Sequence, residues 1–128
     1  MALIIASVIV AALLPLLAKA PMGYAQSKMA GGYDNHNPRE QQKALTGLGL
    51  RALAAHNNAF EAFPPFAAGV LLALWGEAPL FTMQILCGVH IVARVGHALF
   101  YFADVPPLRS LCWAIGMVAS IWLMCLAF

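Results

Sequence analysis

The chain carries very little charge. Asp, Glu, Lys and Arg make up only 9% of its 128 residues, whereas about a quarter of the residues in soluble domains are charged. Hydrophobic residues account for 62%. Because a chain of this length buries a smaller fraction of its surface than a large domain does, it could not hide so much apolar surface from water. The composition therefore argues against a soluble enzyme and a disordered segment, and it favours a small integral membrane protein.

Several chemical signals are also missing. The net charge of +2 comes from seven basic and five acidic residues without any basic run, so no nucleic-acid partner is expected. The three cysteines stand singly, which indicates neither a disulfide framework nor a zinc site. His90 and His97 lie roughly 10 Å apart along a helix, too far to share one metal ion, and we expect no metal. Phosphate-loop, nucleophile-elbow and zinc-protease motifs are absent.

Uncharged apolar stretches make up much of the chain. Residues 2–18 are rich in Leu, Ile, Val and Ala, and as a helix they would cover roughly 25 Å, just enough for a bilayer core. The alternative is a secretory signal peptide, because Ala18-Lys19-Ala20 resembles a cleavage site. A signal peptide requires a basic residue before its apolar run, and none is present. We therefore predict a retained span.

Three further stretches are long enough to cross a membrane, and Gly76-Glu77-Ala78-Pro79 supplies a turn between two of them. We predict an all-α fold in which residues 1–128 form a single domain, an integral membrane four-helix bundle. The predicted spans are residues 2–18, 44–75, 79–103 and 107–128.

The connections differ in length and charge. The first, Lys19 to Lys43, is long and rich in turn-forming residues, and we assign no regular structure to it. Arg109 lies near the third connection, whereas the second has only Glu77. The basic residues of the first connection are Lys19, Lys28, Arg39 and Lys43. Because positive charge favours the cytoplasmic side, we predict that the first and third connections are cytoplasmic and that both chain ends lie opposite.

Two stripes of polar residues interrupt the predicted spans. In the 79–103 span, residues spaced four, three and four apart share one helical face: His90, Arg94, His97 and Tyr101. In the 44–75 span, the stripe consists of Arg51, Asn58 and Glu61. Since ionisable residues are costly inside a membrane, the two faces are expected to meet each other or a neighbouring subunit.

These stripes allow two interpretations. In the first, Glu61 and Arg94 form a buried ion pair that only fixes the register of the helices. In the second, the stripes line a pocket for a small anionic or zwitterionic ligand, which accounts better for charges that do not pair one to one. His90 taken alone favours a helix-packing hydrogen bond over a ligand contact.

Three motifs occur in order along the chain. Asn58 to Phe66 resembles the Asn-x-x-Glu-x-x-Pro signature of helix 2 in the MAPEG family, the membrane-associated proteins of eicosanoid and glutathione metabolism, and His56 suits the same motif. Arg94 to Tyr101 looks like the family's Arg-x-x-His-x-x-x-Tyr segment of helix 3. Pro107 to Ser110 looks like its Pro-x-Arg-Ser opening of helix 4. The compact length and the first loop look most like the short bacterial members.

The resemblance implies a homotrimer that holds glutathione, as a cosubstrate, between adjacent subunits. Asn58 and Glu61 would hold polar groups of the tripeptide, and Arg94 and His97 would support its carboxylates. The full implied ligand-binding set is Arg51, His56, Asn58, Glu61, Arg94 and His97. The implied catalytic residues, around the sulfur, are Tyr101, Arg109 and Ser110.

Such an assignment suits thiol chemistry. A free thiol has a pKa of about 8.5 and the thiolate is the nucleophile, so a nearby guanidinium raises the reactive fraction at neutral pH. Arg109 also lies near the start of a predicted helix, where unpaired N–H groups favour an anion. One position departs from the family pattern: Ala54 stands where an arginine is common, and Arg51 lies one turn earlier.

Two functions therefore compete. The first is a glutathione-dependent transferase or peroxidase acting on hydrophobic electrophiles dissolved in membrane lipid, and Tyr101, Arg109 and Ser110 favour it. The second is a non-catalytic lipid-binding or scaffold protein of the same fold, which Ala54 favours. A small four-span transporter would need a carboxylate midway through the first span, which has none. The expected location is the bacterial inner membrane.

Overall fold

The computed structural model describes residues 1–128, and every regular element in it is a helix, which confirms the predicted all-α class. The helices are α1 Ala2–Ser27, α2 Pro38–Gln42, α3 Gly47–Trp75, α4 Leu80–Phe102 and α5 Pro106–Cys125.

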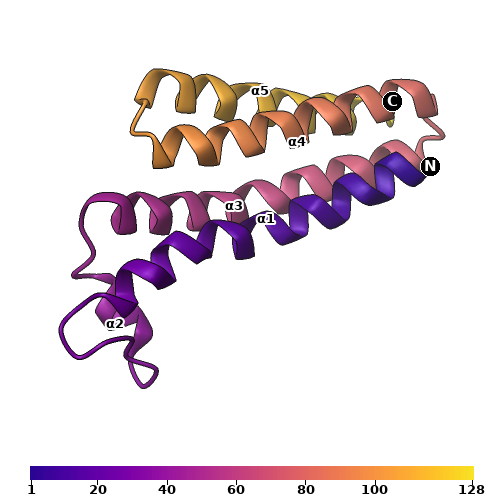
Figure 1. Cartoon of the computed structure of the whole chain (residues 1–128). Helices are drawn as coiled ribbons and strands as arrows, with labels where there is room; N and C mark the ends of the chain where they lie inside the picture. The colour runs from indigo at the N-terminus through magenta and orange to yellow at the C-terminus, as the bar shows by residue number, and fades with distance from the viewer.

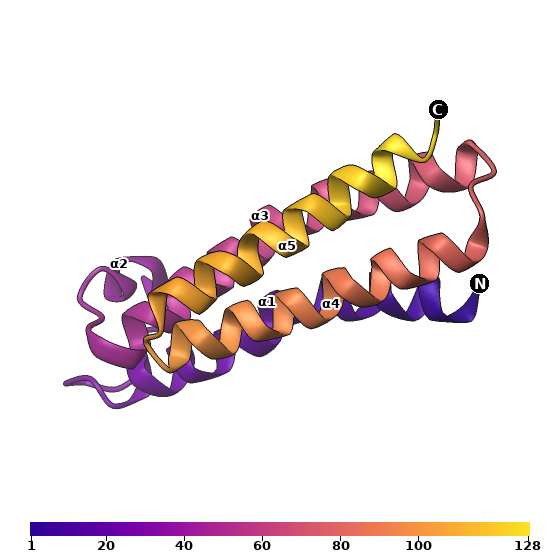
Figure 2. The ribbon, with the colours of Figure 1, turned by 90° about the horizontal axis from the view of Figure 1, so that it is seen from above.

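The four long helices lie side by side, and α3 contacts α1, α4 and α5 (Figures 1 and 2). Both chain ends lie at one end of the molecule, opposite α2 and the α4–α5 connection (Figure 1). We call the end that contains residues 28–46 and 103–105 the loop end. The two connections predicted to share one side of a membrane therefore lie at the same end of the molecule.

Three of the long helices, α1, α4 and α5, are long and apolar enough to cross a membrane. The fourth, α3, is equally long but falls outside that group, because residues such as Arg51, Asn58 and Glu61 lower its hydropathy. The prediction that all four helices span the bilayer as one domain thus rests on the packing of α3 beside the others, and it stays a prediction.

The prediction of no regular structure after residue 18 is wrong at its start, because α1 continues to Ser27. Lys19 ends the apolar run, but a charge limits the membrane-buried segment and not the helix itself. Residues that favour helices follow, among them Ala20 and Ala25. Met22 is fully buried and packs with Leu45 and Ala52, which stabilises the extra turns.

The rest of the first connection also contains structure that the prediction omitted. The short helix α2 begins with Pro38, a residue suited to the first helical position because its missing N–H would have no partner there. The Gln41 side chain donates to the carbonyl oxygen of Gly32 at 2.7 Å and accepts from Nε2 of the buried Gln26 at 3.0 Å. These side-chain bonds, which turn composition does not reveal, fasten the loop to α1.

The helices α3 and α4 end in the same way. In each, a residue with a left-handed backbone follows the helix, Glu77 at φ 53° and Asp104 at φ 58°. The next residue donates back into the last turn, Ala78 to Ala73 at 2.9 Å and Val105 to Phe100 at 3.0 Å. This arrangement is a Schellman motif, which usually has glycine at the left-handed position. It reverses the chain sharply and places α4 beside α3 and α5 beside α4.

Apolar contacts hold the two ends of the molecule, with a polar zone between them. Near the chain ends, Phe66, Met83 and Leu123 belong to a buried cluster shared by α3, α4 and α5. A smaller cluster around Met22 lies at the loop end. Between the two, α4 presents three buried polar residues: His90, Arg94 and His97. The candidate functional residues therefore sit where helices pack and not on a loop.

Candidate functional site

A chain of hydrogen bonds joins α4 to α3 in the polar zone. The buried Arg94 donates from Nη2 to the Asn58 Oδ1 at 2.7 Å and to the backbone oxygen of the same residue at 3.3 Å. Asn58 donates from Nδ2 to Oε2 of Glu61 at 3.2 Å, and Glu61 is exposed. The two polar stripes thus meet at Arg94 and Asn58, which is one of the two arrangements that the sequence left open.

The interpretation of Glu61 and Arg94 as a direct ion pair is wrong. The ion pairs of the structure are Lys43 with Glu40 and Arg51 with Asp104. Asn58 stands between the other two charges, because an amide can accept from a guanidinium and donate to a carboxylate at once. The exposed Glu61 carboxylate therefore remains available to a cation from outside the chain.

A second group lies where α4 and α5 meet. His97 Nδ1 is 3.0 Å from the carbonyl oxygen of Arg109, and the His97 ring meets the Tyr101 ring edge to face with centroids 5.1 Å apart. The Arg109 guanidinium carbon lies 4.4 Å from the centre of the Tyr101 ring, within the range of a cation–π contact. The structure therefore brings together three of the predicted residues, whereas Ser110 is exposed on α5.

The start of α5 offers fewer N–H groups to an anion than the sequence suggested. Pro106 and Pro107 have none, and the N–H of Arg109 donates to the Val105 carbonyl at 3.1 Å. Leu108 is left as the unpaired donor of the first turn. Stabilisation of an anion here therefore depends on the Arg109 side chain more than on the helix terminus.

Two further predicted residues, Arg51 and His56, form polar contacts away from Arg94 and Asn58. Arg51 Nη1 lies 3.5 Å from Oδ2 of Asp104, which links α3 to the turn after α4, and its Nε is buried without a partner. His56 Nδ1 lies 2.7 Å from the carbonyl oxygen of Pro15 in α1. His56 thus joins α3 to α1 through this nitrogen and is not part of the chain around Arg94.

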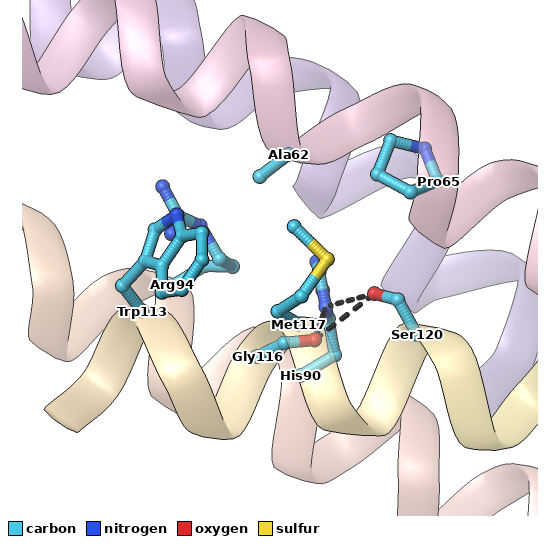
Figure 3. Close-up of a pocket in the computed structure, with 8 residues that line it drawn as sticks. All are labelled: Ala62, Pro65, His90, Arg94, Trp113, Gly116, Met117 and Ser120. Atoms are coloured by element: carbon cyan, nitrogen blue, oxygen red, sulfur yellow. Dashed lines mark hydrogen bonds between the residues drawn. The ribbon is translucent and has the colours of Figure 1, made fainter. Parts of the chain in front are cut away.

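His90 packs between α4 and α5 (Figure 3). Its Nδ1 lies 3.1 Å from the Gly116 carbonyl oxygen and 3.0 Å from the Ser120 hydroxyl. Its ring stacks on Phe66 of α3, with centroids 3.9 Å apart. These contacts confirm the interpretation of His90 as a helix-packing residue.

Two of these partners were not predicted from the sequence. Asp104 lies in a recognisable turn, but nothing in the sequence pairs it with Arg51, which is 53 positions earlier. Ser120 follows Gly116 by one helical turn, and that small, polar face of α5 was a signal that could have found it.

The hollows at this site are too small for a tripeptide. The hollows beside His90 and Arg94 are each about 10 Å³, the size of one water molecule. No group of His, Cys, Asp and Glu side chains is placed to hold a metal ion. A ligand of Asn58 and Glu61 would therefore lie on the outer face where Glu61 is exposed.

Comparison with known proteins gives one result. The family model described as the MAPEG family matches residues 3–128. No curated protein and no solved structure shows a significant match to the chain.

Proposed function

Because the chain belongs to the MAPEG family, a family that includes glutathione transferases and peroxidases, we propose that it is a glutathione-dependent transferase or peroxidase embedded in the membrane. Its substrates are hydrophobic electrophiles dissolved in lipid. The observation that carries the proposal is the Arg109 guanidinium lying over the Tyr101 ring at 4.4 Å. A fixed cation at the edge of an apolar helix bundle suits a ligand that must become an anion.

The proposed assembly is a homotrimer of four-helix bundles, each helix crossing the bilayer. Glutathione lies between adjacent subunits, against the outer face of α3 on which Glu61 is exposed. The hollows beside His90 and Arg94 hold only about 10 Å³ each, too little for a tripeptide, which supports a placement outside the single chain. The proposed location is the bacterial inner membrane. The loop end is proposed to be cytoplasmic, because it contains Lys28, Arg39 and Lys43.

In the proposed binding mode, Glu61 accepts the ammonium group of glutathione and Asn58 holds a neighbouring polar group. Arg94 already donates to Asn58 at 2.7 Å, so it orients that amide as well as adding positive charge for a carboxylate. Arg51 and His97 supply further carboxylate contacts, and His56 supports α3 from α1. The pair Arg51–Asp104 is weakly held, at 3.5 Å, so a ligand carboxylate can compete with Asp104.

In the proposed reaction, Arg109 and Ser110 stabilise the thiolate of glutathione beside Tyr101. The thiol proton passes to water, and the sulfur forms a bond to an electrophilic carbon whose leaving group departs with its bonding electrons. The guanidinium acts by favouring the anion before the electrophile arrives, which is electrostatic preorganisation.

The alternative is a non-catalytic lipid-binding or scaffold member of the family. One observation favours it: an open groove of about 570 Å³ between α4 and α5 is lined almost wholly by apolar side chains, among them Ile85, Val89 and Trp122. Such a groove fits an acyl chain and needs no thiol. Lipid would then bind equally well with and without glutathione.

Calorimetry with glutathione on the detergent-purified protein tests the proposal. We expect wild-type protein to bind, and Glu61→Gln to weaken binding by roughly 10- to 150-fold, because losing a charge-assisted hydrogen bond costs about 1.5–3 kcal/mol. The introduced amide can still accept from Asn58, so the helix contact survives. Glu40→Gln is the matched control, since Glu40 of α2 pairs with Lys43 just after that helix. No heat of binding in wild type would leave the scaffold alternative in place.

A further inference from the structure

The buried Arg94 has more hydrogen-bond donors than its protein partners accept. A guanidinium carries five N–H groups. Both hydrogen bonds that Arg94 makes run from Nη2 to Asn58, at 2.7 Å and 3.3 Å. Nε and Nη1 donate to no atom of the protein, although Arg94 is only 4% exposed. Because a buried donor without a partner costs free energy, these nitrogens indicate an acceptor that is not a protein group.

A small hollow lies beside the Arg94 side chain, where α3, α4 and α5 meet (Figure 3). Its volume of about 10 Å³ gives room for one water-sized molecule and not for a carboxylate or a larger ligand. Ala62 and Pro65 of α3 line one side of it. The polar part of the lining comes from α4 and α5 and consists of His90, Arg94, Gly116 and Ser120.

His90 offers an acceptor to the same hollow. Its Nδ1 lies 3.1 Å from the Gly116 carbonyl oxygen and 3.0 Å from the Ser120 hydroxyl, and Ser120 itself donates to that carbonyl. Both neighbours of Nδ1 therefore accept, so Nδ1 carries the hydrogen and Nε2 of the neutral ring has a lone pair. No protein group donates to Nε2. A molecule that accepts from Arg94 and donates to His90 would satisfy both side chains.

Water suits this combination of groups better than an anion does. An anion could accept from Arg94, but the lone pair on His90 Nε2 would repel it, whereas water both accepts and donates. A second hollow of the same volume touches Arg94 and His90 from the side of α1, and its other lining residues are apolar, among them Leu14 and Phe63. Because a buried water needs two to four polar partners, the first hollow is the better site.

We propose that the hollow between α3, α4 and α5 binds one water molecule, which accepts from Arg94 and donates to Nε2 of His90. This water completes a polar network that begins at Gly116 and Ser120 in α5 and ends at the exposed Glu61 carboxylate in α3. It holds the inner side of the guanidinium and so keeps Nη2 directed to α3. The proposal goes beyond the glutathione function and does not depend on it, because it concerns the chain without ligand.

Valine and threonine have nearly the same shape, so they test the polarity of the hollow at a fixed volume. At Ala62 either side chain would enter the hollow and displace the water. The threonine hydroxyl can then accept from Arg94, and valine cannot. We expect the equilibrium constant for unfolding in mixed micelles to be at least about tenfold larger for Ala62→Val than for Ala62→Thr, the effect of losing one hydrogen bond to a charged group.

Ala67 provides the matched control, because it is another half-buried alanine of α3 and lines neither hollow. There we expect Ala67→Val to be at least as stable as Ala67→Thr. If Ala62→Val is also at least as stable as Ala62→Thr, the hollow is dry and the proposal is overturned.

Nuclear magnetic resonance of the wild type tests the occupant directly and covers the case in which a variant does not fold. We expect cross-relaxation between the guanidinium hydrogens of Arg94 and a long-lived water molecule. We also expect no change in the Arg94 signals when chloride in the buffer is replaced by the bulkier gluconate. Absence of the water signal at Arg94 would refute the proposal, and a response to chloride would assign the hollow to an anion instead.

Discussion

At the scale of single residues, Arg109 is the side chain on which the proposed chemistry depends. It is half-buried at the start of α5, and its guanidinium lies over Tyr101. We expect Arg109→Ala to raise the pKa of bound glutathione by about one to three units, because a nearby cation shifts an acid by that much. Turnover should fall and affinity should change little. Arg109→Lys should recover part of the rate, because the charge survives although the planar fork does not.

Ultraviolet absorbance of the thiolate, titrated against pH, measures this effect directly. Each pKa unit corresponds to about 1.4 kcal/mol, so a shift of one unit is easily resolved. Identical titration curves for wild type and Arg109→Ala would mean that Arg109 only reaches the interface and orients the protein.

At the scale of elements, two glycines in long helices have opposite surroundings. A Cβ on Gly69 of α3 would lie 2.7 Å from the Ser120 backbone oxygen and 3.0 Å from Leu123 Cβ of α5. A Cβ on Gly88 of α4 would meet nothing within 4 Å. We expect Gly69→Ala to destabilise by about 1–3 kcal/mol through overpacking. We expect Gly88→Ala to be neutral or to stabilise by up to about 1 kcal/mol, the difference in helix propensity.

Unfolding of both variants in mixed detergent micelles, followed by circular dichroism, gives the comparison. Gly88→Ala is the same substitution at a position with open space around it. An equal loss of stability in the two variants would therefore contradict the close packing of α3 against α5.

The helix ends show which boundaries residue propensities can locate and which they cannot. The turn after residue 75 was predicted from Gly76 and Pro79, and α3 and α4 do break there. The end of α1 was missed, because the sequence marks only where charge begins, whereas the helix continues to Ser27 with Met22 and Gln26 fully buried against the rest of the chain. Tertiary contacts extended that helix, and a local rule has no access to them.

At the scale of the whole molecule, the single chain leaves the charge of one side chain exposed. Glu61 lies well within α3 and is exposed. In the proposed arrangement, in which α3 crosses the bilayer, a charge facing lipid would cost about 3 kcal/mol. Association with further copies, with bound ligand between them, would remove that cost. We expect native mass spectrometry from mild detergents to report a trimer, and Glu61→Gln, which removes the charge without altering shape, to remain trimeric. A monomer under every mild condition would contradict the proposed assembly.

The sequence alone determined the class of the protein and the residues to inspect. A composition with so few charges leaves a chain of this length no way to bury its apolar surface in water, and helical spacing put His90, Arg94, His97 and Tyr101 on one face. Both inferences follow from local chemistry and from the period of a helix.

Only the tertiary structure decided which of those residues act together. Spacing cannot say that Arg94 binds Asn58 and not Glu61, that Asp104 pairs with Arg51, or that His97 reaches the backbone of Arg109. Each of these contacts joins two different helices, or a helix and a turn that packs against it. The geometry of these contacts depends on how the helices are rotated and crossed when the apolar clusters at the two ends of the molecule pack. No single segment of the sequence contains that information.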